Sequence, residues 1–147
     1  MRFLEPSLIS LDVEAKNAEE AIRAAGRLLV DSGAAKNSYI EAMLASYREK
    51  GPYFVLAPRI ALPHAKAEDG VNEASVSFVR LKQPIEFGHA HNDPVELVFA
   101  LGSSSSEEHI TLLRKLTTLL NNPANVEAMK QAATPDEVSA LLAKAEA

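Results

Sequence analysis

The segment that most restricts the fold is VELVFALG, at residues 95–102, where apolar side chains occupy both faces of an extended strand. A strand at the surface of a protein alternates apolar and polar residues, whereas a strand that is apolar on both faces has to be covered on both sides. This segment therefore predicts a sheet that is packed between helices.

The rest of the chain supplies those helices and further strands. Apolar residues recur at helical spacing from about residue 18 to Gly33, and again from about Ser38 to Gly51-Pro52. Three later helices are marked by capping residues at Ser105, at Asn122-Pro123 and at Thr134-Pro135. We expect an α/β fold, a three-layer sandwich in which a mixed central β-sheet of about five strands is flanked by helices on both faces. The expected strands are residues 8–13, YFVLAP (53–58), RIALPH (59–64), ASVSFVRL (74–81) and VELVFALG.

Composition narrows the functional classes. The 147 residues correspond to one expected domain, residues 1–147, and the formal net charge is -5 without a basic cluster. This charge argues against nucleic acid or an anionic membrane as the main partner, and no stretch is apolar enough to insert into a membrane. The chain has no cysteine, which excludes a disulfide framework and fits a cytoplasmic location.

One histidine follows a proline at the end of a predicted strand, in RIALPHAKAEDG (59–70). Pro63 fixes its own φ and favours extended geometry at Leu62, so His64 should stand at the strand tip at a fixed angle. The alternative is a histidine that is only hydrogen-bonded in a loop. The alanine and the charged segment that follow favour an accessible imidazole.

A second histidine lies in the first turn of a predicted helix. Ser105 and Glu108 form an S-x-x-E capping box, and His109 shares a helix face with leucines of the core. His109 is either a packing residue or part of an anion site, because it lies beside free N–H groups and the positive end of the helix dipole. The serine-rich loop, including Ser105 and Ser106, could add hydroxyls and amides for a phosphate.

The other two histidines belong to HAHND, residues 89–93. His89, His91 and Asp93 resemble the first metal ligands of metallo-β-lactamase-like hydrolases, but Pro94 stands where that motif has another histidine. Two imidazoles do not make a zinc site, so a metal-dependent hydrolase is the minor alternative. The sequence contains no Gly-rich phosphate loop.

At IALPHAKAEDGV, residues 60–71, the sequence resembles enzyme IIA components of the bacterial sugar phosphotransferase system, in the mannitol/fructose class. The resemblance extends over EAML, PVELVFAL, EEHITLLRKLTTLL and TPDEVSALLAKAEA, and so covers nearly the whole chain. GPYFVLAP and NDP resemble the ascorbate-specific branch in particular.

This resemblance implies the roles of several residues. His64, the histidine of the A-x-P-H motif, would carry the phosphoryl group, and His109 would stabilise it. Arg48, sixteen residues before His64, matches an arginine of the mannitol-type proteins and is either a phosphoryl ligand or an exposed helix residue. Such a transfer needs a neutral nitrogen in line with the phosphorus and donors for three equatorial oxygens, which Ser105, Ser106 and the amides of their helix would help to supply.

The resemblance also implies the reaction and the partners. The chain would be a phosphotransferase that accepts phosphate from phospho-HPr on His64 and passes it to a cysteine of a IIB domain. Sugar uptake, with ascorbate as the candidate sugar, would follow through the membrane component IIC, without cofactor or metal. A regulatory module controlled by phosphorylation of His64 is the alternative within the same family.

Overall fold

In the computed structural model, which describes residues 2–146, two long antiparallel strands, β4 and β5, form the centre of a mixed five-stranded sheet. The short strands β1 and β2 both run parallel to β4 along its outer edge, and β3 runs parallel to β5 on the other side. The strands are β1 (Arg2–Phe3), β2 (Ile9–Val13), β3 (Ile60–Ala61), β4 (Ser75–Ile85) and β5 (Val95–Gly102).

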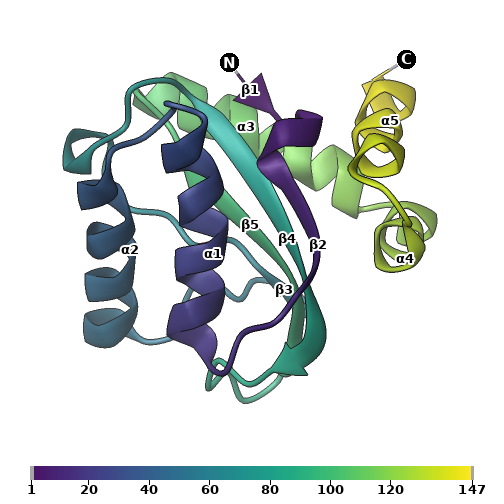
Figure 1. Ribbon diagram of the computed structural model, residues 1–147, viewed down its shortest axis with the longest axis horizontal. Coiled ribbons are helices and arrows are strands. Elements are labelled where there is room, and N and C mark those ends of the chain that lie inside the picture. Colours follow the sequence, from purple (N-terminus) through teal and green to yellow (C-terminus); the bar gives the residue numbers. More distant parts are fainter. Residues whose placement is uncertain (1, 147) are drawn as a thin grey trace.

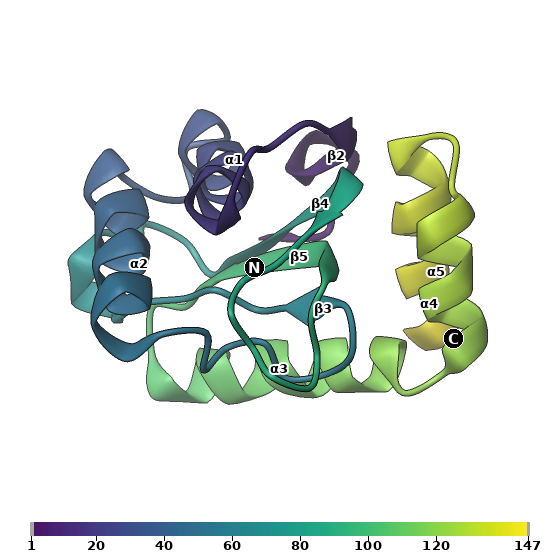
Figure 2. The same cartoon turned by 90° about the horizontal axis from the view of Figure 1, so that it is seen from below.

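Helices cover both faces of this sheet. In two perpendicular views, α1 and α2 lie over one face and α3 crosses the other, while α4 and α5 pack beyond the edge that β2 forms (Figures 1 and 2). The three-layer α/β prediction is confirmed. No helix within residues 2–146 combines the length and the apolar character that a membrane span requires. The helices are α1 (Ala18–Asp31), α2 (Asn37–Lys50), α3 (Ser106–Leu120), α4 (Pro123–Gln131) and α5 (Pro135–Glu146), with short 3-10 helices η1 (Pro6–Leu8) and η2 (Ala67–Asp69).

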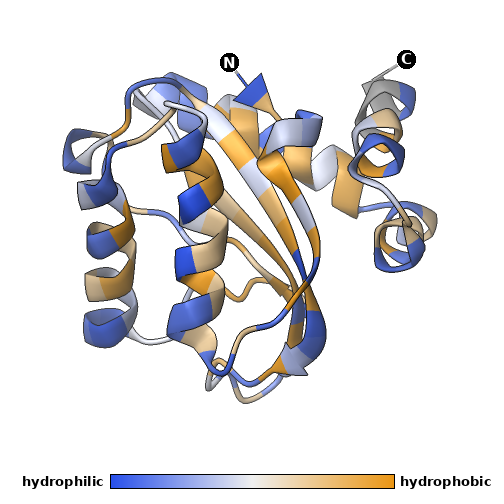
Figure 3. Cartoon of the chain, viewed as in Figure 1, coloured by the Kyte–Doolittle hydropathy of each residue, from blue (hydrophilic) through white to orange (hydrophobic). Residues whose placement is uncertain are grey.

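The core consists of two apolar layers that are separated by the sheet. Val79 and Val98 face α1 and α2. The rings of Phe78 and Phe99 stack on the side of α3, with 4.8 Å between their centroids. The apolar colouring of β4 and β5 between more polar outer helices shows the same arrangement (Figure 3). The inference that VELVFALG is covered on both sides is therefore correct, because seven of its eight residues are buried.

The expected strand at YFVLAP is wrong. Residues 53 and 54 lie in a turn, and the N–H of Val55 donates to the carbonyl of Pro52 at 3.0 Å. This stretch is apolar because Phe54 packs edge-on against Tyr47 and Phe87 in the core, and not because it pairs in the sheet. The fifth strand is instead β1, at the start of the chain.

The predicted starts of the three C-terminal helices are confirmed by their caps. The side chains of Ser105, Asn122 and Thr134 accept hydrogen bonds from the backbone N–H groups of Glu108, Ala124 and Glu137, respectively. Each contact satisfies a donor that the first turn of a helix leaves unpaired. The cap at Ser105 fixes the start of α3, and thereby the place of His109.

Candidate functional site

His64 lies just beyond the end of β3, where the chain continues alongside β5. It forms a parallel bridge with Leu101, whose N–H donates to the carbonyl of Pro63 at 3.0 Å. The imidazole is partly exposed. The expected place of His64 at a strand tip is therefore what the structure shows.

One ring nitrogen of His64 is held by the backbone of its own segment. Nδ1 lies 2.8 Å from the carbonyl oxygen of Leu62. A carbonyl oxygen can only accept a hydrogen bond, so Nδ1 carries the hydrogen. In a neutral imidazole this leaves Nε2 with its lone pair, and Nε2 is the nitrogen that can act as a nucleophile.

His109 stands beside His64. The two ring centroids are 5.4 Å apart, and the rings are inclined by 48°. Burial lowers the pKa of His109, and the nearby His64 lowers it further, because each disfavours the charged imidazolium. His109 is therefore neutral near pH 7. The sequence pointed to both histidines, and the fold brings them together from β3 and α3.

A buried tyrosine ties the His64 segment to the sheet. The hydroxyl of Tyr39, on α2, accepts a hydrogen bond from the N–H of Ala65 at 3.0 Å and donates one to the carbonyl of Leu101. Tyr39 thus holds the residue after His64 against the end of β5. Sequence reasoning missed it, although its i, i+4 spacing to Met43 places it on the apolar face of α2.

We expect Tyr39→Phe to lower the free energy of unfolding by about 1–3 kcal/mol, because the N–H of Ala65 and the carbonyl of Leu101 lose a buried partner. Burial raises the pKa of Tyr39 to about 12. Since a tyrosine in the unfolded chain titrates near pH 10, the contribution of this hydroxyl is fully present below about pH 10 and is lost as the pH rises toward about 12.

Urea unfolding of the parent and of Tyr39→Phe at several pH values measures this effect. The difference in stability between the two proteins should be constant below about pH 10 and should shrink above it. A difference that does not depend on pH up to 12 would contradict the assigned role of the hydroxyl.

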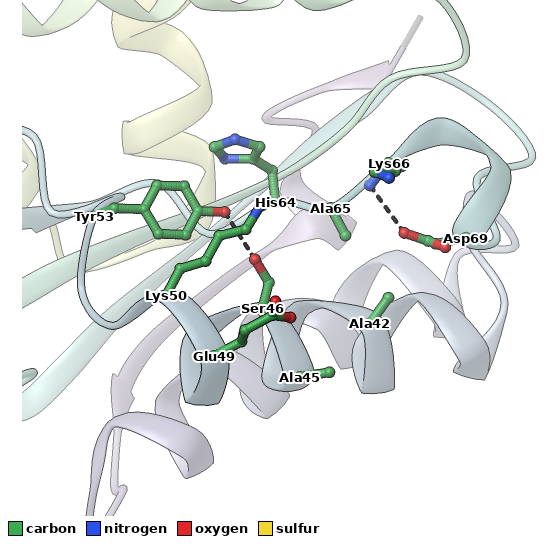
Figure 4. Close-up of a pocket in the computed structure, with 10 residues that line it drawn as sticks. All are labelled: Ala42, Ala45, Ser46, Glu49, Lys50, Tyr53, His64, Ala65, Lys66 and Asp69. Atoms are coloured by element: carbon green, nitrogen blue, oxygen red, sulfur yellow. Dashed lines mark hydrogen bonds between the residues drawn. The ribbon is translucent and has the colours of Figure 1, made fainter.

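Two open grooves, each of about 560 Å³, meet at His64. One is shared with His109 and the loop between β5 and α3. The other groove lies against α2, where Lys50 reaches over the ring of Tyr53 (Figure 4). The rings of Tyr53 and His64 meet edge-on, with 5.8 Å between their centroids. Lys66 lines both grooves. Sequence reasoning missed Lys50, Lys66 and Tyr53, because no motif distinguishes them from other surface residues.

The structure does not bring Arg48 to this site. Its guanidinium donates two hydrogen bonds to Glu19 of α1, at 2.6 and 3.3 Å, and it is absent from the residues that line the two grooves. The hydrogen bond to Arg48 lowers the pKa of Glu19. Arg48 lies two residues before Lys50, about half a helix turn, and it faces α1, which matches the exposed-residue alternative in this conformation.

Ser105 and Ser106 lie where the sequence placed them, at the start of α3, and both line the groove that His64 and His109 share. The hydroxyl of Ser105 accepts the N–H of Glu108, so it is engaged as a cap. The carboxylate of Glu108 accepts from Ser104 instead of completing the predicted capping box. Residues of the first turn of α3 line this groove, and the first turn of a helix leaves backbone N–H groups without partners inside the helix.

The HAHND segment lies at the other end of β5. The segment ends just before Val95, the first residue of β5, whereas His64 pairs with Leu101 near the end of that strand. Because the six residue steps from Val95 to Leu101 span roughly 20 Å, the HAHND segment lies about that far from His64. The carboxylate of Asp93 accepts three backbone N–H groups, and Nδ1 of His89 accepts two more. Among the residues described, no cluster of three or more His, Cys, Asp or Glu side chains is arranged to hold a metal ion. These contacts give Asp93 and His89 a structural role in a turn.

Known proteins resemble this chain in fold and in sequence over nearly its full length. The chain is 33% identical over 139 residues to the ascorbate-specific PTS system EIIA component of Salmonella choleraesuis, covering 94% of this chain and 90% of that protein. A putative PTS IIA (PtxA) from Streptococcus mutans superimposes with a TM-score of 0.90 at 30% identity, covering 99% and 96% of the two chains.

A solved complex of enzyme IIA and phosphorylated enzyme IIB of the mannitol system, from Escherichia coli, gives a TM-score of 0.84 at 32% identity, with 97% of this chain and 99% of that chain covered. The sequence model of the family described as "Phosphoenolpyruvate-dependent sugar phosphotransferase system, EIIA 2" matches residues 2–145. The match to the family model and the relatives at 30% identity or more over nearly the whole chain show that this chain belongs to the EIIA 2 family of the phosphoenolpyruvate-dependent sugar phosphotransferase system.

Proposed function

We propose that this chain is a phosphoryl carrier that accepts phosphate from phospho-HPr on Nε2 of His64 and passes it to a cysteine of a IIB domain. The observation that carries the proposal is the hydrogen bond from Nδ1 of His64 to the carbonyl of Leu62, at 2.8 Å. In the neutral ring this contact leaves the lone pair on Nε2, and His64 lines two open grooves.

The transfer needs no proton movement at His64. The lone pair of Nε2 forms a bond to phosphorus while the bond between phosphorus and the imidazole of HPr breaks, and the electron pair of that bond returns to the donor nitrogen. The imidazole of His64 then carries phosphate on Nε2 and hydrogen on Nδ1, so the ring is positively charged. The carbonyl of Leu62 stabilises this charge through its hydrogen bond. In the next step a thiolate of IIB forms the bond to phosphorus, and Nε2 recovers its pair.

The surroundings of His64 suit a phosphoryl group. His109 can donate a hydrogen bond to a phosphoryl oxygen, and the amides at the start of α3, including that of Ser106, present the positive end of a helix dipole. Lys50 and Lys66 add positive charge on the side of α2. Arg48 is left out of the proposed site because Glu19 holds it.

The open shape of the site suits protein partners. Two of the three large apolar side chains that are exposed in the described chain lie at the site: Tyr53 touches the ring of His64, and Ile110 lines the groove of His109. The third, Leu56, lines a separate groove beside α3. Exposed apolar side chains that gather around a reactive group are typical of a surface on which another protein docks. A closed pocket for a small substrate would instead surround the reactive atom.

The experiment is incubation of the chain with phosphoenolpyruvate, enzyme I and HPr, followed by detection of an acid-labile, base-stable adduct. Phosphorus and ¹⁵N NMR should place the phosphate on Nε2 of His64. An adduct on Nδ1, or none at all, would refute the proposal.

We further propose, from the ascorbate-specific relatives, that the partner is the IIB domain of an ascorbate system. Transfer from the phosphorylated chain to an ascorbate-type IIB should be faster than transfer to a mannitol-type IIB. Equal rates would remove the support for ascorbate. A phosphorylated chain that donates to neither would indicate the regulatory alternative.

A further inference from the structure

We propose that Ser103 is a positioning residue whose hydroxyl donates a hydrogen bond to Nδ1 of His109 and so keeps the hydrogen of that imidazole on Nε2. Nε2 is then the nitrogen that donates to a phosphoryl oxygen. The contact between Ser103 and His109 does not depend on the proposed function, whereas the direction of its hydrogen bond and its consequence for transfer rest on that function.

Ser103 occupies a place where its hydroxyl needs a partner. It is the first residue after β5, at the start of the loop that leads to α3, and it is only 9% exposed. Its Oγ lies 3.3 Å from Nδ1 of His109. A buried hydroxyl without a hydrogen bond is costly, so this contact is retained in the folded protein.

The direction of this hydrogen bond follows from what the neighbouring site requires. Phosphoryl oxygens only accept hydrogen bonds, so the group beside them must donate. A neutral imidazole has a single N–H, and if Nδ1 used it toward Ser103, Nε2 would turn a lone pair toward the phosphoryl group. The pKa of His109 is lowered by burial and by His64, so the ring is neutral and the position of its hydrogen matters. A hydroxyl can donate to Nδ1, and it thereby leaves the N–H on Nε2.

The groups that contact Nδ1 thus hold the two histidines in opposite tautomers. His64 faces a carbonyl, which only accepts, so its hydrogen is on Nδ1 and its Nε2 is a nucleophile. His109 faces a hydroxyl, which can donate or accept, and when the hydroxyl donates to Nδ1 the hydrogen of His109 is on Nε2. This difference explains why His64 takes up the phosphate although both rings line the same groove.

¹⁵N NMR of the imidazoles in the unphosphorylated chain tests the hydrogen bond directly, at a pH well above the lowered pKa of His109. In the parent, Nδ1 of His109 should have the chemical shift of an unprotonated nitrogen and Nε2 that of an N–H, whereas His64 should show the reverse. In Ser103→Ala the signals of His109 should move toward a mixture of both states. A parent His109 with its hydrogen on Nδ1 overturns the proposal, whether or not the chain is phosphorylated.

Phosphoryl transfer measures the consequence. Ser103→Ala should slow transfer from HPr by about 5–10-fold, which corresponds to the loss of one neutral hydrogen bond. Ser77→Ala is the matched control, because the hydroxyl of Ser77 is buried too and donates to the carbonyl of Ala25 of α1 at 2.8 Å, and Ser77 lines neither groove. The Ser77→Ala protein should lose a similar free energy of unfolding. Its transfer rate and the position of the hydrogen on the ring of His109 should be those of the parent. Equal transfer rates in the parent and in Ser103→Ala would overturn the role of Ser103, and so would an equal reduction of the transfer rate in Ser103→Ala and Ser77→Ala.

A parent that accepts no phosphate would refute the proposed function, while the NMR result would still decide on the hydrogen bond.

Discussion

His64→Ala accepts no phosphate from phospho-HPr and keeps its fold, if Nε2 of His64 is the nucleophile. The side chain is partly exposed and donates one hydrogen bond to the carbonyl of Leu62, so its removal should change the free energy of unfolding by about 1 kcal/mol or less. Loss of the nucleophile removes the covalent step completely, because no other nitrogen occupies its position. Electrophoresis with radioactive phosphoenolpyruvate and a urea unfolding curve measure the two effects.

The matched control is the double variant His89→Ala and His91→Ala. It removes two imidazoles at the other end of β5, and it should be phosphorylated at a rate within a few-fold of the parent. A His64→Ala protein that still forms a histidine adduct would contradict the assignment. A double variant that loses phosphorylation while it remains folded would contradict the structural role of the HAHND turn.

His109→Ala should retain phosphate acceptance but transfer it about 10²–10³-fold more slowly, the effect that is typical for loss of one donor to a transition state. His109 lies 5.4 Å from His64 between ring centroids, close enough for the two rings to share one phosphoryl group. His109→Gln should recover part of the rate, because an amide donates a hydrogen bond but cannot carry phosphate. Rapid-quench measurement of single turnovers gives these rates.

Titration provides a second test of His109. Its pKa is lowered in the free protein by burial first and by His64 second. A doubly negative phosphoryl group on His64 favours the charged imidazolium, so phosphorylation should raise the pKa of His109. Unchanged transfer rates in His109→Ala, together with a pKa that does not respond to phosphorylation, would show that His109 only packs against the leucines of α3.

Several features of the protein could be predicted from the sequence because they depend on neighbours along the chain. A capping side chain acts within three residues, so Ser105, Asn122 and Thr134 marked the starts of three helices. Pro63 acts on the residues beside it, and it placed His64 at the tip of β3. The apolar faces of β5 were enough to require layers on both sides of the sheet.

Other features could not be predicted because they depend on residues that meet only in the folded chain. YFVLAP has the composition of a strand, but Phe54 joins the aromatic cluster of Tyr47 and Phe87, so the segment turns instead of pairing. Arg48 follows a familiar motif, yet Glu19 lies within reach on α1 and holds it away from the grooves.

The same distinction between local and tertiary contacts applies to the site. The sequence by itself determined which imidazoles stand at a strand tip and at a helix start, since strand ends and helix caps are local. Only the tertiary structure decided that the two rings lie side by side, that Tyr39 ties the residue after His64 to β5, and that Leu62 and Ser103 are the Nδ1 partners. The physical reason is that a hydrogen bond acts over about 3 Å, so which nitrogen of each ring carries the hydrogen depends on the atoms that folding brings next to it.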